Sequence, residues 1–146
     1  MQDPPNFLRS SQRSDVSLVK KGYLLLVLHA HLPFVRHPEH EDFLEERWLF
    51  EAISETYLPL IEVFDRLLED NIHFRITMSV TPTLATMLQD ELLQSRTLRY
   101  FNRVLELIEK EIERTRHDAV FRPVVEMYRE NFYRRRDLFE KRYGRN

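Results

Sequence analysis

One apolar run limits what this chain can fold into more than any other feature. Residues 22–28, with the sequence GYLLLVL, show no alternation of apolar and polar side chains, and polar residues follow abruptly. A strand without such alternation is covered on both faces, as in a parallel sheet or in the wall of an α/β barrel. We therefore predict a buried strand over residues 22–29.

Two histidines stand at the carboxyl end of this predicted strand. His29 and His31 are two residues apart, so their side chains point to the same side. Pro33 has no amide hydrogen to give to a neighbouring strand, and it ends the pairing. Because α/β barrels carry their sites at the carboxyl ends of strands, His29 and His31 are candidate site residues.

A helix and a second strand follow. Apolar residues at helical spacing predict a helix over residues 45–70. Within it, Pro59 removes a hydrogen bond to the carbonyl of Glu55, so we expect a kink or a break near residues 56–58. Residues 72–80 alternate between apolar and polar side chains, which predicts a second strand and a right-handed βαβ unit.

The remaining pattern is helical. We predict helices throughout residues 82–143, with Thr81 as the N-cap and Pro82 at the first helical position. A crossover between parallel strands needs only about a dozen residues. We therefore interpret this region as a helical insertion beside the site.

The residues around the histidines resemble a known family. The segment HAHLPFVRHPE at 29–39 is similar to the first signature region of glycoside hydrolase family 57, and ERWLFEAISETYLPL at 46–60 is most like its α-1,4-glucan branching enzymes. The resemblance extends from residue 21 to residue 146. It implies an α/β fold in which 21–146 form the amino-terminal part of a catalytic (β/α)7 TIM-like barrel, with only its first two strands present.

The resemblance also implies an activity. A branching enzyme of this family cleaves α-1,4 bonds in a glycogen-like α-glucan and forms α-1,6 links, without a metal or organic cofactor. Retaining cleavage needs a nucleophilic carboxylate and an acid about 5 Å apart. The family carries this glutamate and aspartate on later strands, so we expect no catalytic residue in this chain, the rest of the barrel as its partner, and no activity from the chain alone.

The resemblance implies three substrate-binding residues. His29 and His31 would line the floor of the sugar pocket and hydrogen-bond to sugar hydroxyls, and Trp48 would stack on the glucan. From the residues alone, the histidines could equally be buried structural groups, and Trp48 could be the edge of a core. Five nearby carboxylates match no catalytic position, and we interpret them as solvated charge: Glu39, Glu41, Asp42, Glu45 and Glu46.

Two other functions stay open from the residues. His29 and His31 could ligate zinc in a metal-dependent deacetylase or hydrolase on a similar barrel, with His37 or His40 as the third protein ligand. The region from Thr81 onward could instead be a non-enzymatic helical interaction module.

Composition disfavours several classes of protein. The net charge of −2, from 22 basic and 24 acidic residues, provides no field that favours nucleic acid or an anionic membrane. The apolar run is too short to span a membrane and lacks a signal-peptide cleavage site. Without cysteine the chain fits a reducing compartment, so we expect a cytoplasmic protein.

The basic residues near the carboxyl terminus are interrupted by acids and are interpreted as a solvated helix face: Arg134, Arg135, Arg136, Lys141, Arg142 and Arg145.

The ends of the chain give a further expectation. Residues 1–20 lack periodicity and are interpreted as a disordered leader. The chain has two glycines, Gly22 and Gly144, whereas a complete α/β domain needs glycine in several tight turns. Gly144 is typical of a helix C-cap. Because two parallel strands cannot cover a run that is apolar on both faces, we expect an amino-terminal piece of a longer protein.

Overall fold

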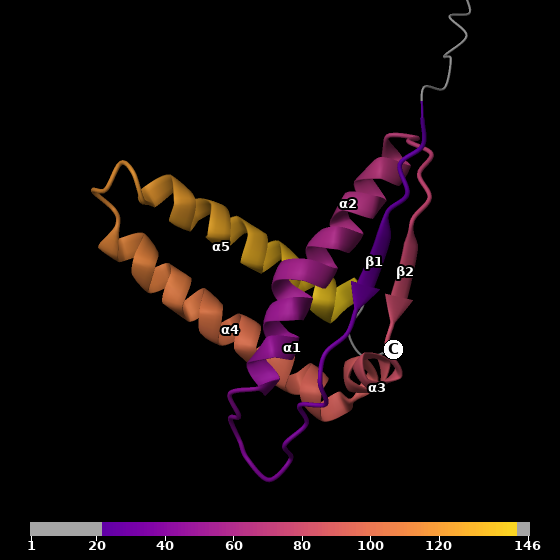
Figure 1. Cartoon of the computed structure of the whole chain (residues 1–146). Helices are drawn as coiled ribbons and strands as arrows, with labels where there is room; N and C mark the ends of the chain where they lie inside the picture. Colours follow the sequence, from indigo (N-terminus) through magenta and orange to yellow (C-terminus); the bar gives the residue numbers. More distant parts are fainter. Residues whose placement is uncertain (1–21, 143–146) are drawn as a thin grey trace, which may run out of the picture.

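The computed structural model of the chain describes residues 22–142. The predicted leader, residues 1–20, and the predicted cap at Gly144 lie outside the described residues. The protein is an α/β structure in which helices accompany a two-stranded parallel sheet (Figure 1). Its elements are, in order, β1 (Val27–Ala30), α1 (Glu46–Ala52), the π-helix η1 (Ile53–Tyr57), α2 (Leu58–Glu69), β2 (Thr77–Val80), α3 (Pro82–Gln89), α4 (Glu91–Arg114), α5 (Arg122–Asp137) and the π-helix η2 (Leu138–Arg142).

The two strands run side by side in the same direction, with α2 returning beside them (Figure 1). Both are shorter than the predicted ranges of 22–29 and 72–80. The described hydrogen bonds between the two segments extend from Thr77 N, which donates to Leu26 O, to Thr81 N, which donates to Ala30 O. Only this stretch forms a ladder, and each strand therefore has four residues.

The helix between the strands is continuous but irregular. At its centre η1 replaces the α-helical pattern, and Leu58 N donates to Ile53 O, five residues back. Pro59 explains this, because it has no amide hydrogen and its ring crowds the carbonyl of Glu55. The predicted disturbance is present, but it takes the form of a π-helical turn at residues 53–57 that joins α1 directly to α2.

Side chains cap the two helices that follow β2. The Thr81 hydroxyl accepts from Leu84 N at 3.4 Å, and Pro82 is the first residue of α3, which confirms the predicted start of that helix. Asp90 then ends α3 and caps α4, because its Oδ1 accepts from Leu93 N at 2.9 Å. The boundary between α3 and α4 therefore lies at Asp90, a position that the spacing of apolar residues does not indicate.

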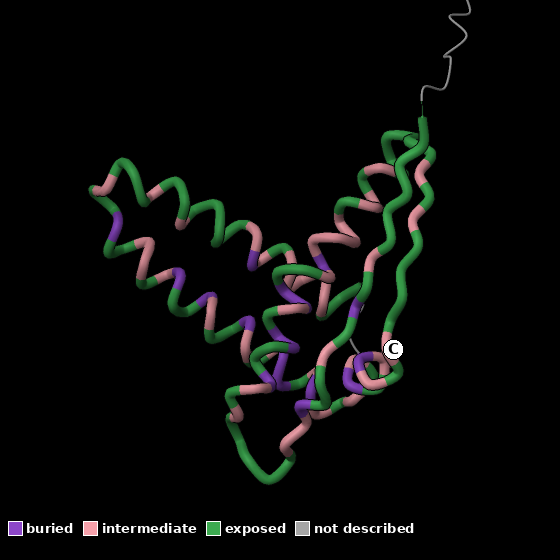
Figure 2. Tube along the Cα trace, in the orientation of Figure 1, coloured by how far each residue is buried: buried purple, intermediate pink, exposed green. Residues whose placement is uncertain are grey.

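The core lies where α1, η1 and α4 meet, and α5 packs on α4 in an antiparallel pair (Figures 1 and 2). On α5, however, Phe132 is the one buried residue, while Val124, Met127 and Tyr128 are exposed. The buried apolar residues are Ala30, Val35, Leu49, Phe50, Ile53, Leu58, Leu84, Met87, Leu93, Phe101, Leu105, Ile108 and Phe132. Among residues 22–142, no helix has both the length and the apolar character needed to cross a membrane.

The sequence predicts that the basic residues at the end of α5 form a solvated face. In the structure several of them instead pair with acidic residues of another helix. Arg134 Nε donates to Glu62 Oε1 at 2.5 Å, and Arg142 Nη1 donates to Asp65 Oδ2 at 2.7 Å. Arg135 lies 3.7 Å from the other Glu62 oxygen and is only 16% exposed. These arginines join α5 and η2 to acids on α2, a pairing between distant segments that local charge patterning does not reveal. Arg145 lies outside the described residues.

Candidate functional site

The two histidines at the end of β1 lie together. Their rings are stacked with centroids 4.9 Å apart and an interplanar angle of 28°, which confirms that both point the same way. Both residues are exposed, whereas Ala30 between them is buried in the core. The histidines are therefore exposed at the end of β1 and are not buried structural groups.

Ser79 on β2 completes this arrangement. It lies opposite His29 in the parallel register, and its Oγ is 2.5 Å from His29 Nδ1. A neutral imidazole has one donor and one acceptor nitrogen, so a bond at Nδ1 fixes which role Nε2 can play. Sequence reasoning missed Ser79. Alignment of the carboxyl ends of the two predicted strands, residues 29 and 80, sets His29 opposite Val80, one residue away from the observed register, so only the tertiary structure places Ser79 beside His29.

A groove of about 650 Å³ lies between the end of β1 and the helix that follows it. Its volume is in the range of about 300–1,000 Å³ that small-molecule sites occupy. Glu55 is the one carboxylate in its lining, so the groove by itself does not hold the carboxylate pair of a retaining glycosidase. The lining residues are Leu28, His29, Ala30, His31, Leu32, Ala52, Glu55, Thr56, Tyr57, Pro59, Leu60, Val63 and Met78.

Trp48 lies apart from the histidines. It belongs to the first turn of α1 and is 47% exposed, while the next two residues, Leu49 and Phe50, are buried. The indole is not part of the groove lining. Its exposed ring is free to stack on a flat ligand, as aromatic side chains in sugar sites do. The structure thus separates the predicted site residues into two places, which the segment between β1 and α1 connects.

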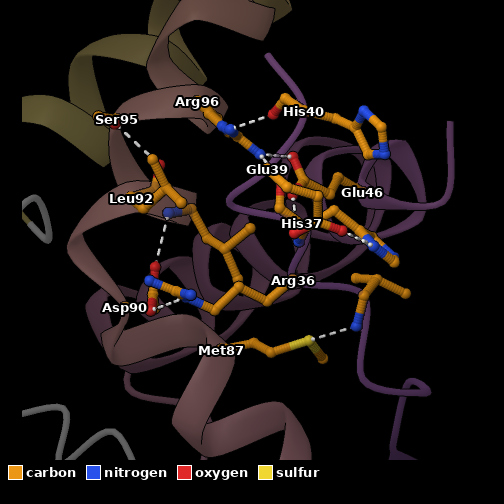
Figure 3. Close-up of polar contacts among 12 residues, drawn as sticks. Arg36, His37, Glu39, His40, Glu46, Met87, Asp90, Leu92, Ser95 and Arg96 are labelled. Atoms are coloured by element: carbon orange, nitrogen blue, oxygen red, sulfur yellow. Dashed lines mark hydrogen bonds and ion pairs between the residues drawn. The ribbon is translucent and has the colours of Figure 1, made fainter. Parts of the chain in front are cut away.

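That connecting segment, residues 36–42, is called the β1–α1 loop below. One of the five carboxylates predicted to be solvated lies just beyond it and is in fact buried: Glu46 is 1% exposed and bonds to Arg96 of α4 at 2.5 Å (Figure 3). This corrects the prediction for Glu46. A partner 50 residues away in the chain stabilises the buried charge, and only the packing of α1 on α4 brings it there. Glu39, Glu41 and Asp42 are exposed, and Glu45 is partly exposed.

The metal alternative requires a third protein ligand near the histidine pair. His37 and His40 instead pack on Phe43, with ring centroids 3.7 and 5.1 Å from it, and His37 Nδ1 lies 3.2 Å from Glu39 Oε1. Over residues 22–142 there is no group of three or more His, Cys, Asp or Glu residues that could hold a metal ion. The zinc-dependent reading therefore receives no support from the geometry.

The arrangement can bind a polyhydroxylated ligand. His29 has Nε2 left for a ligand after Ser79 engages Nδ1, and His31 presents a second exposed ring beside it. Imidazole nitrogens can donate to or accept from hydroxyl groups, and the apolar groove next to them can cover the flat faces of a sugar. The arrangement therefore combines hydrogen-bonding rings with an apolar surface at one place.

Several known proteins are similar to this chain in sequence and in fold. The family described as glycosyl hydrolase family 57 matches residues 25–138. The 1,4-alpha-glucan branching enzyme of Thermococcus kodakarensis is 44% identical over 98 residues, which are 67% of this chain and 14% of that enzyme. The chain thus spans a small part of the length of this relative.

Solved structures of family 57 and related enzymes are also similar to this chain. The α-amylase AmyC of Thermotoga maritima matches with a TM-score of 0.77 at 45% sequence identity, over 83% of this chain and 23% of that one. The family 57 branching enzyme of Pyrococcus horikoshii matches with a TM-score of 0.74 at 34% identity, over 82% of this chain and 22% of that one.

Proposed function

The chain belongs to glycosyl hydrolase family 57, and on this premise we propose that it forms part of the sugar-binding side of an α-glucan-active enzyme. The proposed reaction is that of a 1,4-α-glucan branching enzyme, which cleaves an α-1,4 bond and joins the released chain through an α-1,6 link. The similarity to branching enzymes of Thermococcus kodakarensis and Pyrococcus horikoshii supports this choice. No metal or organic cofactor takes part in the proposed reaction.

The single observation that carries the proposal is the position of the two imidazoles. His29 and His31 stand exposed at the carboxyl end of a parallel strand, beside a groove large enough for sugar rings. In our proposal they bind sugar hydroxyls and orient the ring, and Trp48 stacks on another part of the same glucan. Orientation of this kind lowers the barrier of a later step, because the reacting groups already have the right geometry.

The catalytic carboxylates belong elsewhere in this proposal. β1 and β2 are the first two strands of a (β/α)7 barrel, and the nucleophile and the acid come from the part of the enzyme that this chain does not span. The groove supports this division, because Glu55 alone cannot act as both nucleophile and general acid. We accordingly expect the chain alone to bind glucan weakly and to leave its bonds intact.

Tryptophan fluorescence tests the binding step directly, because Trp48 is the chain's one tryptophan. Titration of the chain with maltoheptaose should change the emission of Trp48 in a saturable way, while cellohexaose, a β-linked glucan, serves as the control. His29→Ala and His31→Ala should each weaken binding by roughly tenfold, the effect of losing a buried hydrogen bond worth about 1 kcal/mol or more. Equal binding by the parent and both variants would overturn the assignment.

A second measurement tests the division of labour. The chain should produce no new reducing ends and no α-1,6 branches from amylose. Reducing-end assays and debranching followed by chain-length analysis would detect either product. Branching by the chain alone would show that it contains a complete catalytic pair.

A further inference from the structure

The β1–α1 loop is held to α4 by one buried arginine. Arg96 Nη1 donates to His37 O at 3.1 Å, and Arg96 Nη2 donates to His40 O at 2.5 Å (Figure 3). The same guanidinium bonds to both oxygens of Glu46, at 2.5 and 2.7 Å. Glu46 in turn accepts from His37 N at 2.9 Å. The pair therefore contacts the loop backbone at both of its histidines.

The burial of this pair indicates that it does more than stabilise the fold. The side chains of Arg96 and Glu46 are 7% and 1% exposed. Replacement of a buried ion pair by well-packed apolar residues is often neutral or stabilising, so stability alone does not require the charges at this place. The carbonyls of His37 and His40, however, both accept from this one side chain. The planar fork of a guanidinium provides this geometry and a lysine ammonium does not.

Further contacts hold the rest of the loop to the same helix. Arg36 Nε donates to Asp90 Oδ2 at 2.6 Å, at the start of α4 (Figure 3). Arg99 and Arg103 contact Glu41 and Asp42, each at 3.2 Å. The hollow that remains between the loop and α4 has a volume of only about 30 Å³. The loop is thus tied to α4 and its N-cap at both ends, by Arg36 and His37 at one end and by residues 40–42 at the other.

The loop joins the two separated parts of the proposed sugar site. It begins five residues after His31 and ends shortly before Trp48, and Glu46 lies in the same first turn of α1 as Trp48. The histidines and Trp48 do not share the groove, so their separation depends on how the loop is held. We propose that Arg96 and Glu46 are positioning residues, which fix the β1–α1 loop so that the histidine pair and Trp48 bind one glucan chain together.

This inference rests on the proposed function, and its test separates the two. The first variant is the pair Glu46→Leu with Arg96→Leu, which removes both charges, takes the Arg96 donor away from His40 O and leaves His37 O with only the amide of His40. Arg96→Lys is the second variant, which keeps the positive charge beside Glu46 if the double variant fails to fold. Arg114→Lys is the matched control, because Arg114 lies on the same helix and pairs only with Glu111 among the described residues.

Two readouts are measured on the full chain at matched temperature. Amide hydrogen exchange of His37 and His40, whose amides donate to Glu46 Oε1 and to His37 O, should become at least about tenfold faster in both test variants, since Arg96 and Glu46 hold these two residues. Maltoheptaose affinity, followed by Trp48 fluorescence, should fall by roughly tenfold. Arg114→Lys should change neither.

The outcomes are distinct. Unchanged exchange of the His37 and His40 amides in Arg96→Lys or in a folded double variant would overturn the positioning role. Faster exchange with unchanged maltoheptaose affinity would overturn the link between the loop and sugar binding. If the parent chain itself gave no maltoheptaose response, the proposed sugar contact would be wrong and the positioning role with it, while the exchange data would still report whether the pair orders the loop.

Discussion

The helical region and the segments that form the strand pair both carry large apolar side chains, but these differ greatly in burial. In the helical region Phe101 is fully buried, and its ring meets those of Phe132 and Phe139 at centroid distances of 6.0 and 5.8 Å. Leu24 and Leu25, in the most apolar run of the chain, are 83% and 78% exposed. Figure 2 shows this contrast, with buried positions gathered among the helices and few on the strands.

The contrast shows that an apolar side chain becomes buried only where another element packs against it. Each long helix finds an apolar partner among residues 46–142, since α4 packs against both α1 and α5. Among the described residues each strand has one hydrogen-bonded neighbour, and all four residues of β2 are exposed. The proposed barrel explains the difference, because in a barrel each strand has a neighbour on both edges.

Removal of one side of the helical core should have the largest effect. The segment of residues 81–146 lacks α1 and η1, which supply Leu49, Phe50 and Ile53 to the core. We expect this segment to show no cooperative thermal transition when circular dichroism at 222 nm is followed, whereas the full chain should show one. A sharp, reversible transition of the segment would instead favour the independent helical module.

A single core truncation should be the next largest change. Phe101→Ala removes a fully buried ring and should lower the free energy of unfolding by about 3–5 kcal/mol. Urea unfolding followed by circular dichroism measures this value. The matched control is Leu24→Ala, which should change it by less than about 0.5 kcal/mol. Similar losses in the two variants would remove the contrast between the helical region and the strands.

A contact between the two regions should have an intermediate effect. Asp90 caps α4 and also binds Arg36, which follows β1. Asp90→Ala removes both contacts and should cost about 1–2 kcal/mol in urea unfolding. Asp90→Asn retains a capping side chain and should cost less. If the two variants were equally destabilised, the cap would contribute nothing measurable.

Asp90 also gives this contact a pH dependence. Burial raises the pKa of Asp90, but the hydrogen bonds from the Leu93 amide and from Arg36 outweigh burial and lower the pKa overall. A lowered pKa contributes stability that is present above the unfolded value of about 3.9 and is lost as the pH falls through the folded value. The stability difference between the parent and Asp90→Asn should therefore be constant near neutral pH and shrink below about pH 4. Urea unfolding over a pH series checks this, and a difference that grows on acidification would contradict it.

The smallest change in stability is expected on the strand itself. Leu24→Ser combined with Leu25→Ser should alter the free energy of unfolding by less than about 0.5 kcal/mol, because both side chains are exposed. The same change should raise the concentration at which the chain aggregates, since it breaks up an apolar patch next to an open strand edge. Light scattering over a concentration series measures this. Unchanged aggregation would mean that the apolar run does not drive association.

The order of the elements could be read from the sequence. The βαβ order, the start of α3 at Pro82 and the disturbance caused by Pro59 all follow from interactions within a few residues, which spacing and residue type determine. The shared direction of His29 and His31 follows in the same way from the two-residue repeat of a strand. These local features, with the resemblance of residues 29–39 and 46–60, predicted the place of the candidate site.

The tertiary structure alone decided which side chains meet. Ser79 reaches His29, Arg96 reaches Glu46, and Arg134 reaches Glu62 across 50, 50 and 72 residues of chain. No local pattern contains these pairs, because each depends on the strand register or on the angle at which two helices pack. The sequence by itself determined the order of the strands and helices and the shared direction of the two histidines. Packing determined that Glu46 is buried while Leu24 is exposed, since burial depends on which surfaces lie opposite one another and not on the hydrophobicity of one residue.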